Sequence, residues 1–397
     1  MAKTFITNPA DGTQVPFLRG ILTRSLQEAG LDFEDAYTLA SAIRQELNEV
    51  DELSTTDLSE LVLSHLEKAH SRDIVDAYQA SGRIPASIMV KDAEGIIVPF
   101  SQNQHLLCLE ACGLSTKAAT TASEKIYQHL VENEIFELSS ARLGRITYEC
   151  LQQYFSPDIA RRYMVWVDYT HSGRPLILLI GGTAGCGKST ITTEVAHRLG
   201  VVRTQSTDML REVMRMMIPK RLLPVLHTSS FDAWEALPLR YFEKPTQEDL
   251  VANGYYRQME LLSVPCEAVI QRALTERISL ILEGVHVHPS LVKLIDKKQD
   301  AVIVPIMLAI LKQDKLRKRL RGRGEKAPDR TGKRYLSSFD RIWALQTFLL
   351  SEADQARIPI IANDDKEKAT VQIMSTIIDV LGKKFTATPE QVFTDDR

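Results

Sequence analysis

The sequence predicts an α/β protein in which a doubly wound parallel sheet follows two small α+β domains that are mostly helical. Three observations support this prediction. A glycine-rich loop follows a short apolar run, 176–180, and opens a helical pattern that stops at Gly200. Beyond the loop, apolar runs alternate with helical segments, as they do in parallel sheets with crossover helices. Before the loop, one segment of the chain occurs twice.

Length and composition are those of an ordinary multidomain globular protein. The chain has 397 residues, of which 44% are hydrophobic and 25% charged, and its net charge is −3. Two or three domains are expected, without a basic field for nucleic acid or membranes. Five cysteines without a C-x-x-C pair favour reduced thiols, and no apolar run approaches the ~18 residues of a membrane span. We therefore expect a cytoplasmic protein with neither a membrane nor a nucleic-acid partner, and homo-oligomerisation stays open.

The glycine-rich loop reads GTAGCGKS over residues 182–189, which fits the P-loop pattern G-x-x-x-x-G-K-[ST]. Its glycines allow tight turns that aim backbone N–H groups at phosphate oxygens, and the following helix N-terminus favours anions. Lys188 can reach the β- and γ-phosphates of ATP, and the Ser189 hydroxyl can bind Mg²⁺. A P-loop NTPase sheet is therefore predicted. The expected cofactor-binding residues of the loop are Gly182, Thr183, Ala184, Gly185, Cys186, Gly187, Lys188, Ser189 and Thr190.

The repeated segment lies at 6–31 and again at 90–114, and Val15-Pro16-Phe17 matches Val98-Pro99-Phe100 at an offset of 83. Each copy predicts a hairpin, which turns at Asp11-Gly12 or at Glu94-Gly95, and then about three helices. Ser54 and Ser139 are expected to cap the last helix of their copies. The predicted domains are copy one (1–84), copy two with a linker (85–170), the sheet domain (171–384) and a loose tail (385–397).

Both copies resemble the ATP-cone, a small regulatory nucleotide-binding domain. This resemblance implies an allosteric nucleotide site. Copy one carries Arg19 and Arg24 after its Val-Pro-Phe, whereas copy two has Gln102 and Leu107 there. Because phosphate binding needs cations, copy one is the better candidate and copy two is expected to be degenerate. The alternative is that both copies are scaffolding or dimerisation modules.

Four later runs are expected to be strands of the parallel sheet, with function at their carboxyl ends. They are Val201–Gln205, Ile278–Leu282, Ala301–Leu308 and Ile358–Ala362.

Asp208 follows the first of these strands. A carboxylate there can orient an acceptor hydroxyl and take its proton, although it could also be only a helix cap. Arg211 and Arg215 share one helix face and suggest an anionic acceptor, unless they are solvated surface side chains. His227, in an apolar loop with hydroxyl residues, is a further candidate for acceptor binding; a turn with internal hydrogen bonds is the alternative.

Glu283 ends the second expected strand, where it can hold Mg²⁺ through water or polarise the nucleophile. A structural cap is the alternative. His286 and His288 alternate with valines and would share one face of an extended segment. Two histidines without a third ligand are weak evidence for zinc, so we expect no metal there.

Residues 312–334 contain eleven basic and three acidic residues. Together with two glycines, this favours a mobile lid whose arginines neutralise the transferring phosphoryl; a solvated helix face or a nucleic-acid patch is the alternative. One i, i+4 pair should face the site, Arg319 with Arg323 or Arg317 with Arg321. The two residues of the first pair are our catalytic candidates, and Asn363, after the last strand, is expected near the adenine.

Five stretches together resemble the 2-phosphoglycerate kinase family: VPFLRGILTRSLQEAGL, LIGGTAGCGKSTITTEVAHRLG, STDMLREVMR, LLPVLHTSSFDAW and ILEGVHVHP. The resemblance implies transfer of the γ-phosphoryl of ATP to the 3-hydroxyl of 2-phosphoglycerate, with 2,3-bisphosphoglycerate as product. It covers most of the chain except residues 85–165, because the family pattern lacks the second cone-like copy.

Three other functions stay open from the residues alone. The acceptor could be an inositol phosphate, a sugar acid or another phosphorylated acid. The protein could instead be an ATP-sensing regulator without turnover, in which Asp208 and Glu283 would have no task. A polynucleotide end kinase would use the basic stretch as a groove, which the negative net charge disfavours.

Overall fold

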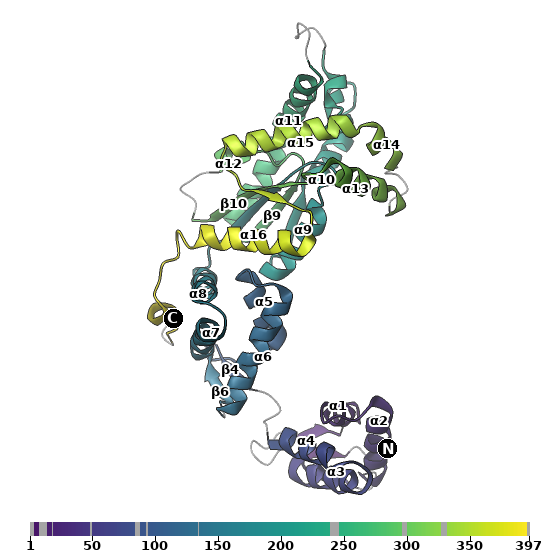
Figure 1. Ribbon diagram of the computed structural model, residues 1–397, viewed down its shortest axis with the longest axis vertical. Coiled ribbons are helices and arrows are strands. Elements are labelled where there is room, and N and C mark those ends of the chain that lie inside the picture. Colours follow the sequence, from purple (N-terminus) through teal and green to yellow (C-terminus); the bar gives the residue numbers. More distant parts are fainter. Residues whose placement is uncertain are drawn as a thin grey trace. The chain divides into compact units, whose positions relative to one another are not determined.

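The computed structural model describes residues 4–7, 14–17, 19–47, 50–83, 88–92, 94–133, 135–238, 246–295, 300–326 and 332–394. The chain divides into two compact units (Figure 1). The first comprises Met1–Lys91, Gly95–Phe100 and Leu130–Leu138, and the second comprises Asp92–Glu94, Ser101–His129 and Ser139–Arg397.

The first unit contains a three-stranded sheet in the order β2-β1-β3. In it β1 (Phe5–Thr7) pairs antiparallel with β2 (Gln14–Pro16) and parallel with β3 (Glu52–Ser54). The predicted turn at Asp11-Gly12 lies outside the described residues. The sheet is accompanied by four helices, α1 (Arg19–Glu28), α2 (Phe33–Glu46), α3 (Thr55–Ala69) and α4 (Arg72–Arg83). Leu26, Ile43 and Leu66 are fully buried in the core of this unit.

The same order of elements follows along the chain. A sheet in the order β5-β4-β6 is formed by β4 (Met89–Lys91), β5 (Ile97–Pro99) and β6 (Glu137–Ser139). Along the chain, α5 (Gln102–Ala111) and α6 (Thr116–Glu132) come between β5 and β6, and α7 (Ser140–Tyr154) follows β6. Ser54 caps α3 and Ser139 caps α7, each by accepting a hydrogen bond from the backbone N–H three residues later. Both serines are therefore helix caps as predicted, but α3 is not the last helix of copy one, because α4 follows it.

The second unit is built on a parallel five-stranded sheet in the order β11-β10-β7-β9-β8. Its strands are β7 (Leu176–Gly181), β8 (Arg203–Ser206), β9 (Leu280–Gly284), β10 (Val302–Ala309) and β11 (Ile360–Ala362). The predicted parallel sheet is confirmed, with the glycine-rich loop at the end of its central, fully buried strand.

The four later strands begin one or two residues after their predicted starts. Val201, Ile278 and Ile358 instead close the preceding helices, because each donates its N–H to the carbonyl five residues earlier. The residue before each has a left-handed conformation: Gly200 at φ 64°, Arg277 at 52° and Arg357 at 55°. This is the C-terminal helix closure in which the apolar residue after the turn packs back on the helix.

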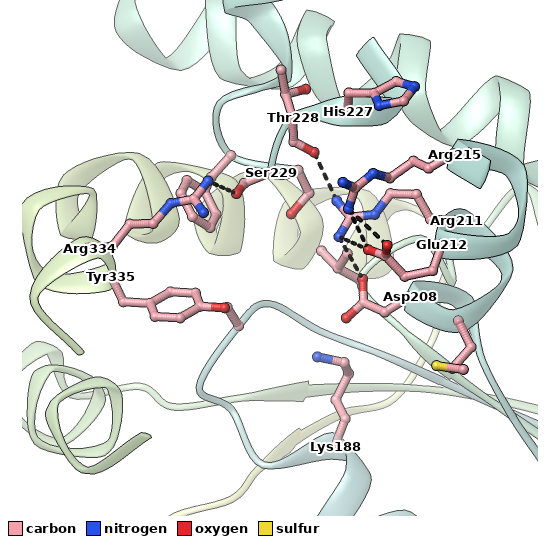
Figure 2. Close-up of a pocket in the computed structure, with 15 residues that line it drawn as sticks. Lys188, Asp208, Arg211, Glu212, Arg215, His227, Thr228, Ser229, Arg334 and Tyr335 are labelled. Carbon is pink, nitrogen blue, oxygen red and sulfur yellow. Dashed lines mark hydrogen bonds and ion pairs between the residues drawn. The ribbon is translucent and has the colours of Figure 1, made fainter. Parts of the chain in front are cut away.

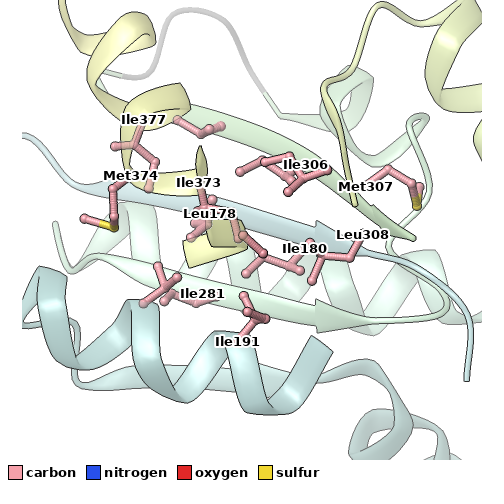
Figure 3. Packing of buried hydrophobic residues seen from close by; sticks show 14 of the residues in the cluster. Leu178, Ile180, Ile191, Ile281, Ile306, Met307, Leu308, Ile373, Met374 and Ile377 are labelled. Atoms are coloured by element: carbon pink, nitrogen blue, oxygen red, sulfur yellow. The ribbon is translucent and has the colours of Figure 1, made fainter. Parts of the chain in front are cut away.

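Helices cover both faces of the sheet (Figure 1). Leu178 and Ile180 of β7 pack with Ile191 of α9 (Lys188–Leu199) and with Ile373 and Ile377 of α16 (Lys366–Leu381) (Figure 3). The alternate residues of β7 pack on the opposite face with α11 (Gln247–Thr275), next to which lies α15 (Phe339–Gln355). Because alternate side chains of β7 pack on opposite faces, the sheet is enclosed by two layers of helices. The glycine-rich loop follows this enclosed strand.

The remaining elements of this unit are α8 (Pro157–His171), α10 (Thr207–Met217), α12 (Leu291–Leu294), α13 (Gln313–Lys326), α14 (Gly332–Ser337), α17 (Pro389–Val392) and two 3₁₀ turns, Pro224–His227 and Ala233–Ala236. Among the described residues, none of the helices is long and apolar enough to cross a membrane.

The C-terminal segment differs from the loose tail that we expected. Over its described part, 385–394, it forms α17 and buries Phe385, Val392 and Phe393. The Phe393 ring stacks on Tyr163 with centroids 6.1 Å apart. A Cβ at Gly144 would lie 2.7 Å from that ring, so the absence of a side chain there admits Phe393. Three apolar side chains spaced irregularly in a polar stretch gave no periodic signal in the sequence.

Candidate functional site

The glycine-rich loop joins β7 to α9 with a backbone that demands glycine. Gly185 has φ 87° and Gly187 has φ 89°, values that other residues rarely adopt. A Cβ at Gly187 would lie 2.5 Å from Asn363 Nδ2, and one at Gly185 would lie 2.7 Å from the Leu320 side chain. The tight loop therefore depends on close approach of α13 and of the turn after β11.

Arg319 and Asn363, both predicted site residues, meet at this loop. Asn363 Nδ2 donates to the Cys186 carbonyl oxygen at 2.8 Å, and Arg319 Nη2 donates to the Asn363 carbonyl oxygen at 2.6 Å. Asn363 is buried, and its Oδ1 has no hydrogen-bond partner among the described residues. A buried acceptor without a donor is costly, so the packing around this turn has a local energetic cost.

Lys188 and Ser189 begin α9, directly after the loop that follows the carboxyl end of β7. Lys188 is buried, and its Nζ donates to the Thr183 carbonyl oxygen at 2.9 Å. The Ser189 hydroxyl donates to Glu283 Oε1 at 3.0 Å, and Glu283 itself is buried at the carboxyl end of β9. The structure thus brings the predicted magnesium ligand and the predicted strand-end carboxylate together.

A cavity of about 300 Å³ opens beside the loop (Figure 2). It is lined by the five predicted residues Lys188, Asp208, Arg211, Arg215 and His227, and also by Ala184. Besides the glycine-rich loop and Val285, its walls come from α10, the loop at 227–231 and α14. The candidates for phosphate binding and for acceptor binding therefore share one pocket. The other seven expected loop residues are not among the residues that line it: Gly182, Thr183, Gly185, Cys186, Gly187, Ser189 and Thr190.

Asp208 is not the N-cap of α10, which was its alternative role. Ser206 is the N-cap of α10, and its side chain accepts a hydrogen bond from Asp208 N at 3.2 Å. The alternative reading of Asp208 as the cap is therefore wrong. One Asp208 oxygen lies 3.7 Å from Arg211 Nη2, and Arg211 Nη1 donates to the Thr228 carbonyl oxygen at 2.9 Å.

Glu212 is a pocket residue that the sequence analysis missed. It accepts two hydrogen bonds from Arg215 Nη1, at 2.7 and 2.9 Å, and lies 3.8 Å from Arg211 Nη2. At three residues from Arg215 on a helix, the pair has the spacing of a solvated surface ion pair, which is why the sequence gave no signal.

Arg334 and Tyr335 of α14 were also missed as pocket residues. Arg334 Nη2 donates to the Ser229 hydroxyl at 3.0 Å, and both residues line the cavity. The signal was present, because Arg334 ends the basic stretch, but the i, i+4 spacing drew attention to α13. Among the described residues, none of α13 lines the cavity. Arg317 stacks instead on Phe339 at 4.1 Å, and the side chain of Arg323 lies outside the described residues.

Helix α13 packs against the glycine-rich loop with an apolar face. Leu316 and Leu320 are fully buried, and both lie near Gly185. The two glycines that suggested a lid, Gly322 and Gly324, lie within the helix. The lid motion itself stays a prediction.

Curated proteins similar to this chain agree in their names. "2-Phosphoglycerate kinase" of Methanopyrus kandleri is 36% identical over 282 residues, which cover 70% of this chain and 84% of that protein. The proteins of the same name from Methanothermobacter thermautotrophicus and Pyrococcus furiosus are 34% and 32% identical over 293 residues, covering 91% and 94% of their lengths. This chain belongs to the 2-phosphoglycerate kinase family. The resemblance seen in the sequence is thereby confirmed, and no family model matches the chain.

By the names of these relatives, the family is one of kinases. The alignments cover 70–75% of this chain but 84–94% of the relatives. About a quarter of this family member therefore lies outside the aligned region.

His286 and His288, both in the second unit, are buried. They do not share an extended face as expected, because β9 ends at Gly284 and the chain turns there. His286 Nε2 donates to Gln258 Oε1 at 2.7 Å, and burial lowers the pKa of this imidazole to about 3. Gln258 Nε2 in turn donates to the Val225 and Thr228 carbonyl oxygens, at 2.6 and 3.2 Å. The neutral His286 thus orients the side chain that holds the 224–228 loop. Within the described chain, no group of three or more His, Cys, Asp or Glu is arranged for a metal ion.

The two arginines predicted for an allosteric nucleotide in this family member do not meet. The Arg19 guanidinium lies 4.2 Å from the centre of the Tyr37 ring and donates to the Ser41 hydroxyl at 3.4 Å. Arg24 pairs with Glu28 at 3.0 Å on the exposed side of α1. Five residues apart on one helix, the two side chains point in different directions.

Proposed function

We propose that this chain transfers the γ-phosphoryl of Mg·ATP to the 3-hydroxyl of 2-phosphoglycerate, giving 2,3-bisphosphoglycerate and ADP. The carrying observation is that Lys188 of the phosphate loop and Asp208 of α10 line the same cavity of about 300 Å³. Arg211, Arg215 and Arg334 line it too, as an acceptor with several negative charges would need. The volume suits a small acid better than an inositol phosphate bearing several phosphates or a nucleic-acid end.

ATP fits the residues around the loop. Positive-φ glycines aim backbone donors at phosphates, and Lys188 is positioned at the start of α9. Asn363, which donates to the Cys186 carbonyl oxygen of the loop, would lie near the adenine. Arg319 lies against the same turn and would contact the nucleotide beside it.

Mg²⁺ fits the Ser189–Glu283 pair. A phosphate-bound Mg²⁺ takes few protein ligands and completes its shell with water and phosphate oxygens. The Ser189 hydroxyl would bind it directly and Glu283 through water; in the structure these oxygens are 3.0 Å apart. The ion would neutralise charge on the transferring phosphoryl.

Asp208 would act on the acceptor. Its carboxylate takes the proton of the 3-hydroxyl as the hydroxyl oxygen forms its bond to the γ-phosphorus, and the bond from that phosphorus to the β,γ-bridging oxygen breaks. Lys188 and the pocket arginines stabilise the charge on the transferred group. The proton remains on Asp208 until the product leaves.

The test is a coupled assay of ADP release over an acceptor panel: 2-phosphoglycerate, 3-phosphoglycerate, glycerate, a sugar acid and an inositol phosphate. We expect the highest kcat/KM with 2-phosphoglycerate, with the product identified by ³¹P NMR. A higher kcat/KM with another acceptor would replace the substrate and keep the kinase. No turnover with any acceptor, despite ATP binding, would favour the ATP-sensing regulator.

We also propose that the cone-like copy one, residues 1–84, binds a second nucleotide, with copy two (85–170) as a degenerate relative. Supporting this, Phe33 and Tyr37 stack with ring centroids 5.8 Å apart and remain 60% and 40% exposed. The adjoining Arg19 adds a cation. Exposed aromatic faces beside a cation can stack a base and hold phosphate.

Calorimetry on two full-length variants tests the second site. In Lys188→Ala, weakened binding at the kinase core should leave one ATP per chain, and adding Arg19→Ala should weaken that binding at least fivefold. An unchanged affinity in the double variant would favour scaffolding for copy one.

A further inference from the structure

The acceptor cavity has two walls of different chemistry (Figure 2). One wall belongs to α10 and carries Asp208, Arg211, Glu212 and Arg215. The opposite wall carries Arg334 and Tyr335 of α14 with Ser229 of the 227–231 loop. Lys188 extends from the glycine-rich loop between the two walls.

The α10 wall is charge-compensated. Its two guanidinium groups face two carboxylates, and Arg215 is held by Glu212 through hydrogen bonds of 2.7 and 2.9 Å. Arg211 Nη2 lies 3.7 Å from Asp208 and 3.8 Å from Glu212, too far for hydrogen bonds. This nitrogen can therefore take one more acceptor, but a dianion here would meet two carboxylates of its own sign.

The α14 wall is rich in donors. Arg334 makes its hydrogen bond to a neutral partner, the Ser229 hydroxyl, and Ser230 and Tyr335 are also among the residues that line the cavity. The nearby carboxylates of Asp232 and Glu235 are both engaged by Arg341, at 3.1 and 2.9 Å. A guanidinium group beside several hydroxyls offers the many donors that a phosphate dianion accepts.

We propose that the pocket separates the two anionic groups of its acceptor: the phosphate binds Arg334 with Ser229 and Ser230, and the carboxylate binds Arg211 on α10. This assignment deepens the proposed function and rests on it. Arg334 and Arg211 contact neighbouring residues of one loop, Ser229 and Thr228. Their guanidinium groups are thus close enough for one small molecule, whose reacting hydroxyl then lies toward Asp208 and Lys188. Arg334 becomes the residue that selects for a phosphorylated acceptor.

A matrix of variants and ligands tests this division. The ligands are 2-phosphoglycerate, glycerol 2-phosphate, which lacks the carboxylate, and glycerate, which lacks the phosphate. Each is measured as a substrate or as a competitive inhibitor of the full-length enzyme. Arg334→Ala should weaken both phosphorylated ligands about 10- to 100-fold, the range for a charge-assisted hydrogen bond, and glycerate less than twofold. Arg211→Ala should weaken 2-phosphoglycerate and glycerate but spare glycerol 2-phosphate.

Controls separate binding from folding and from general charge. Lys333→Ala removes the neighbouring exposed cation on α14, which does not line the cavity, and should change no ligand more than twofold. Arg334→Lys keeps the charge without the planar fork and should recover part of the loss. Ser229→Ala should weaken the phosphorylated ligands alone, and equal melting temperatures would show that these variants fold.

The outcomes are distinct. An equal loss for glycerate and glycerol 2-phosphate in Arg334→Ala, or no loss for any ligand, would overturn the assignment. Inorganic phosphate, tested as an inhibitor, separates this proposal from the proposed function. If 2-phosphoglycerate is not a substrate but phosphate inhibition still requires Arg334, the phosphate subsite stands and the substrate is wrong. If 2-phosphoglycerate reacts and phosphate inhibition ignores Arg334, the subsite is wrong and the function stands.

Discussion

Arg198 offers a test of how α9, the helix after the glycine-rich loop, is held in place. It lies near the end of α9 with only 1% of its side chain exposed. It pairs with Glu194 at 3.1 Å and Glu367 at 2.8 Å, and lies 3.9 Å from the buried Glu110 of α5. The cluster thus joins α9 and α16 to α5, all within the second unit. We expect its loss to destabilise that unit.

The size of the effect follows from burial. Arg198→Met keeps the stem of the side chain but leaves Glu110 and Glu367 without their cation, and breaking a buried pair in this way costs about 3–5 kcal/mol. For a unit of this size, that corresponds to a fall in Tm of about 6–15 °C. The exposed pair of Arg257 and Glu260, at 67% and 59% exposure, provides the matched control. Arg257→Met should cost less than about 1 kcal/mol.

Calorimetry and urea unfolding measure both variants. If Arg198→Met and Arg257→Met lower Tm by the same small amount, the buried cluster is not a stabilising anchor. The double variant Arg198→Met/Glu110→Gln separates the cause of a large effect. It should recover part of the stability, because Glu110 no longer carries a buried charge.

Three further predictions concern the site and its surroundings. Asp208→Asn should lower kcat at least 100-fold and change the KM for ATP less than threefold in steady-state assays, and an unchanged kcat would exclude Asp208 as the base. Gly187→Ala should weaken ATP binding at least tenfold by calorimetry, since its Cβ would meet Asn363 Nδ2 at 2.5 Å; Gly173→Ala, also at positive φ but with open space, should leave binding unchanged. The Glu194 pKa is lowered, first by its hydrogen bond with Lys366 and then by Arg198. The stabilisation by the ionised carboxylate is therefore present above the ordinary pKa of 4.5 and is lost as pH falls below it. Between pH 6 and 3, the free energy of unfolding of wild type should fall more than that of Glu194→Gln. Parallel plots of this free energy against pH would contradict the prediction.

The sequence predicts what periodicity and local motifs specify. The parallel strands were located because each is a short apolar run, and Asp208 and Glu283 were found because parallel strands share one functional edge. The starts of the strands were placed too early because the apolar residues at 278 and 358 close helices instead. Apolar character alone does not distinguish these two uses.

The missed features all depend on tertiary contacts. Glu212 and Arg215 have the spacing of a surface ion pair, and only the tertiary fold shows that both line the pocket. Arg334 lies in α14, after the α13 helix that carries the i, i+4 arginine pairs. Its hydrogen bond to Ser229 joins residues more than a hundred positions apart. The C-terminal segment is too short for a periodic pattern, although Phe393 is buried.

The most direct test of the central claim follows the labelled γ-phosphoryl of ATP in the presence of 2-phosphoglycerate. We predict that the label appears on the 3-oxygen of 2,3-bisphosphoglycerate with wild type, and that Lys188→Ala forms no product although its circular dichroism and Tm are those of wild type. Label found only in free phosphate, or product formed equally by Lys188→Ala, would contradict the account.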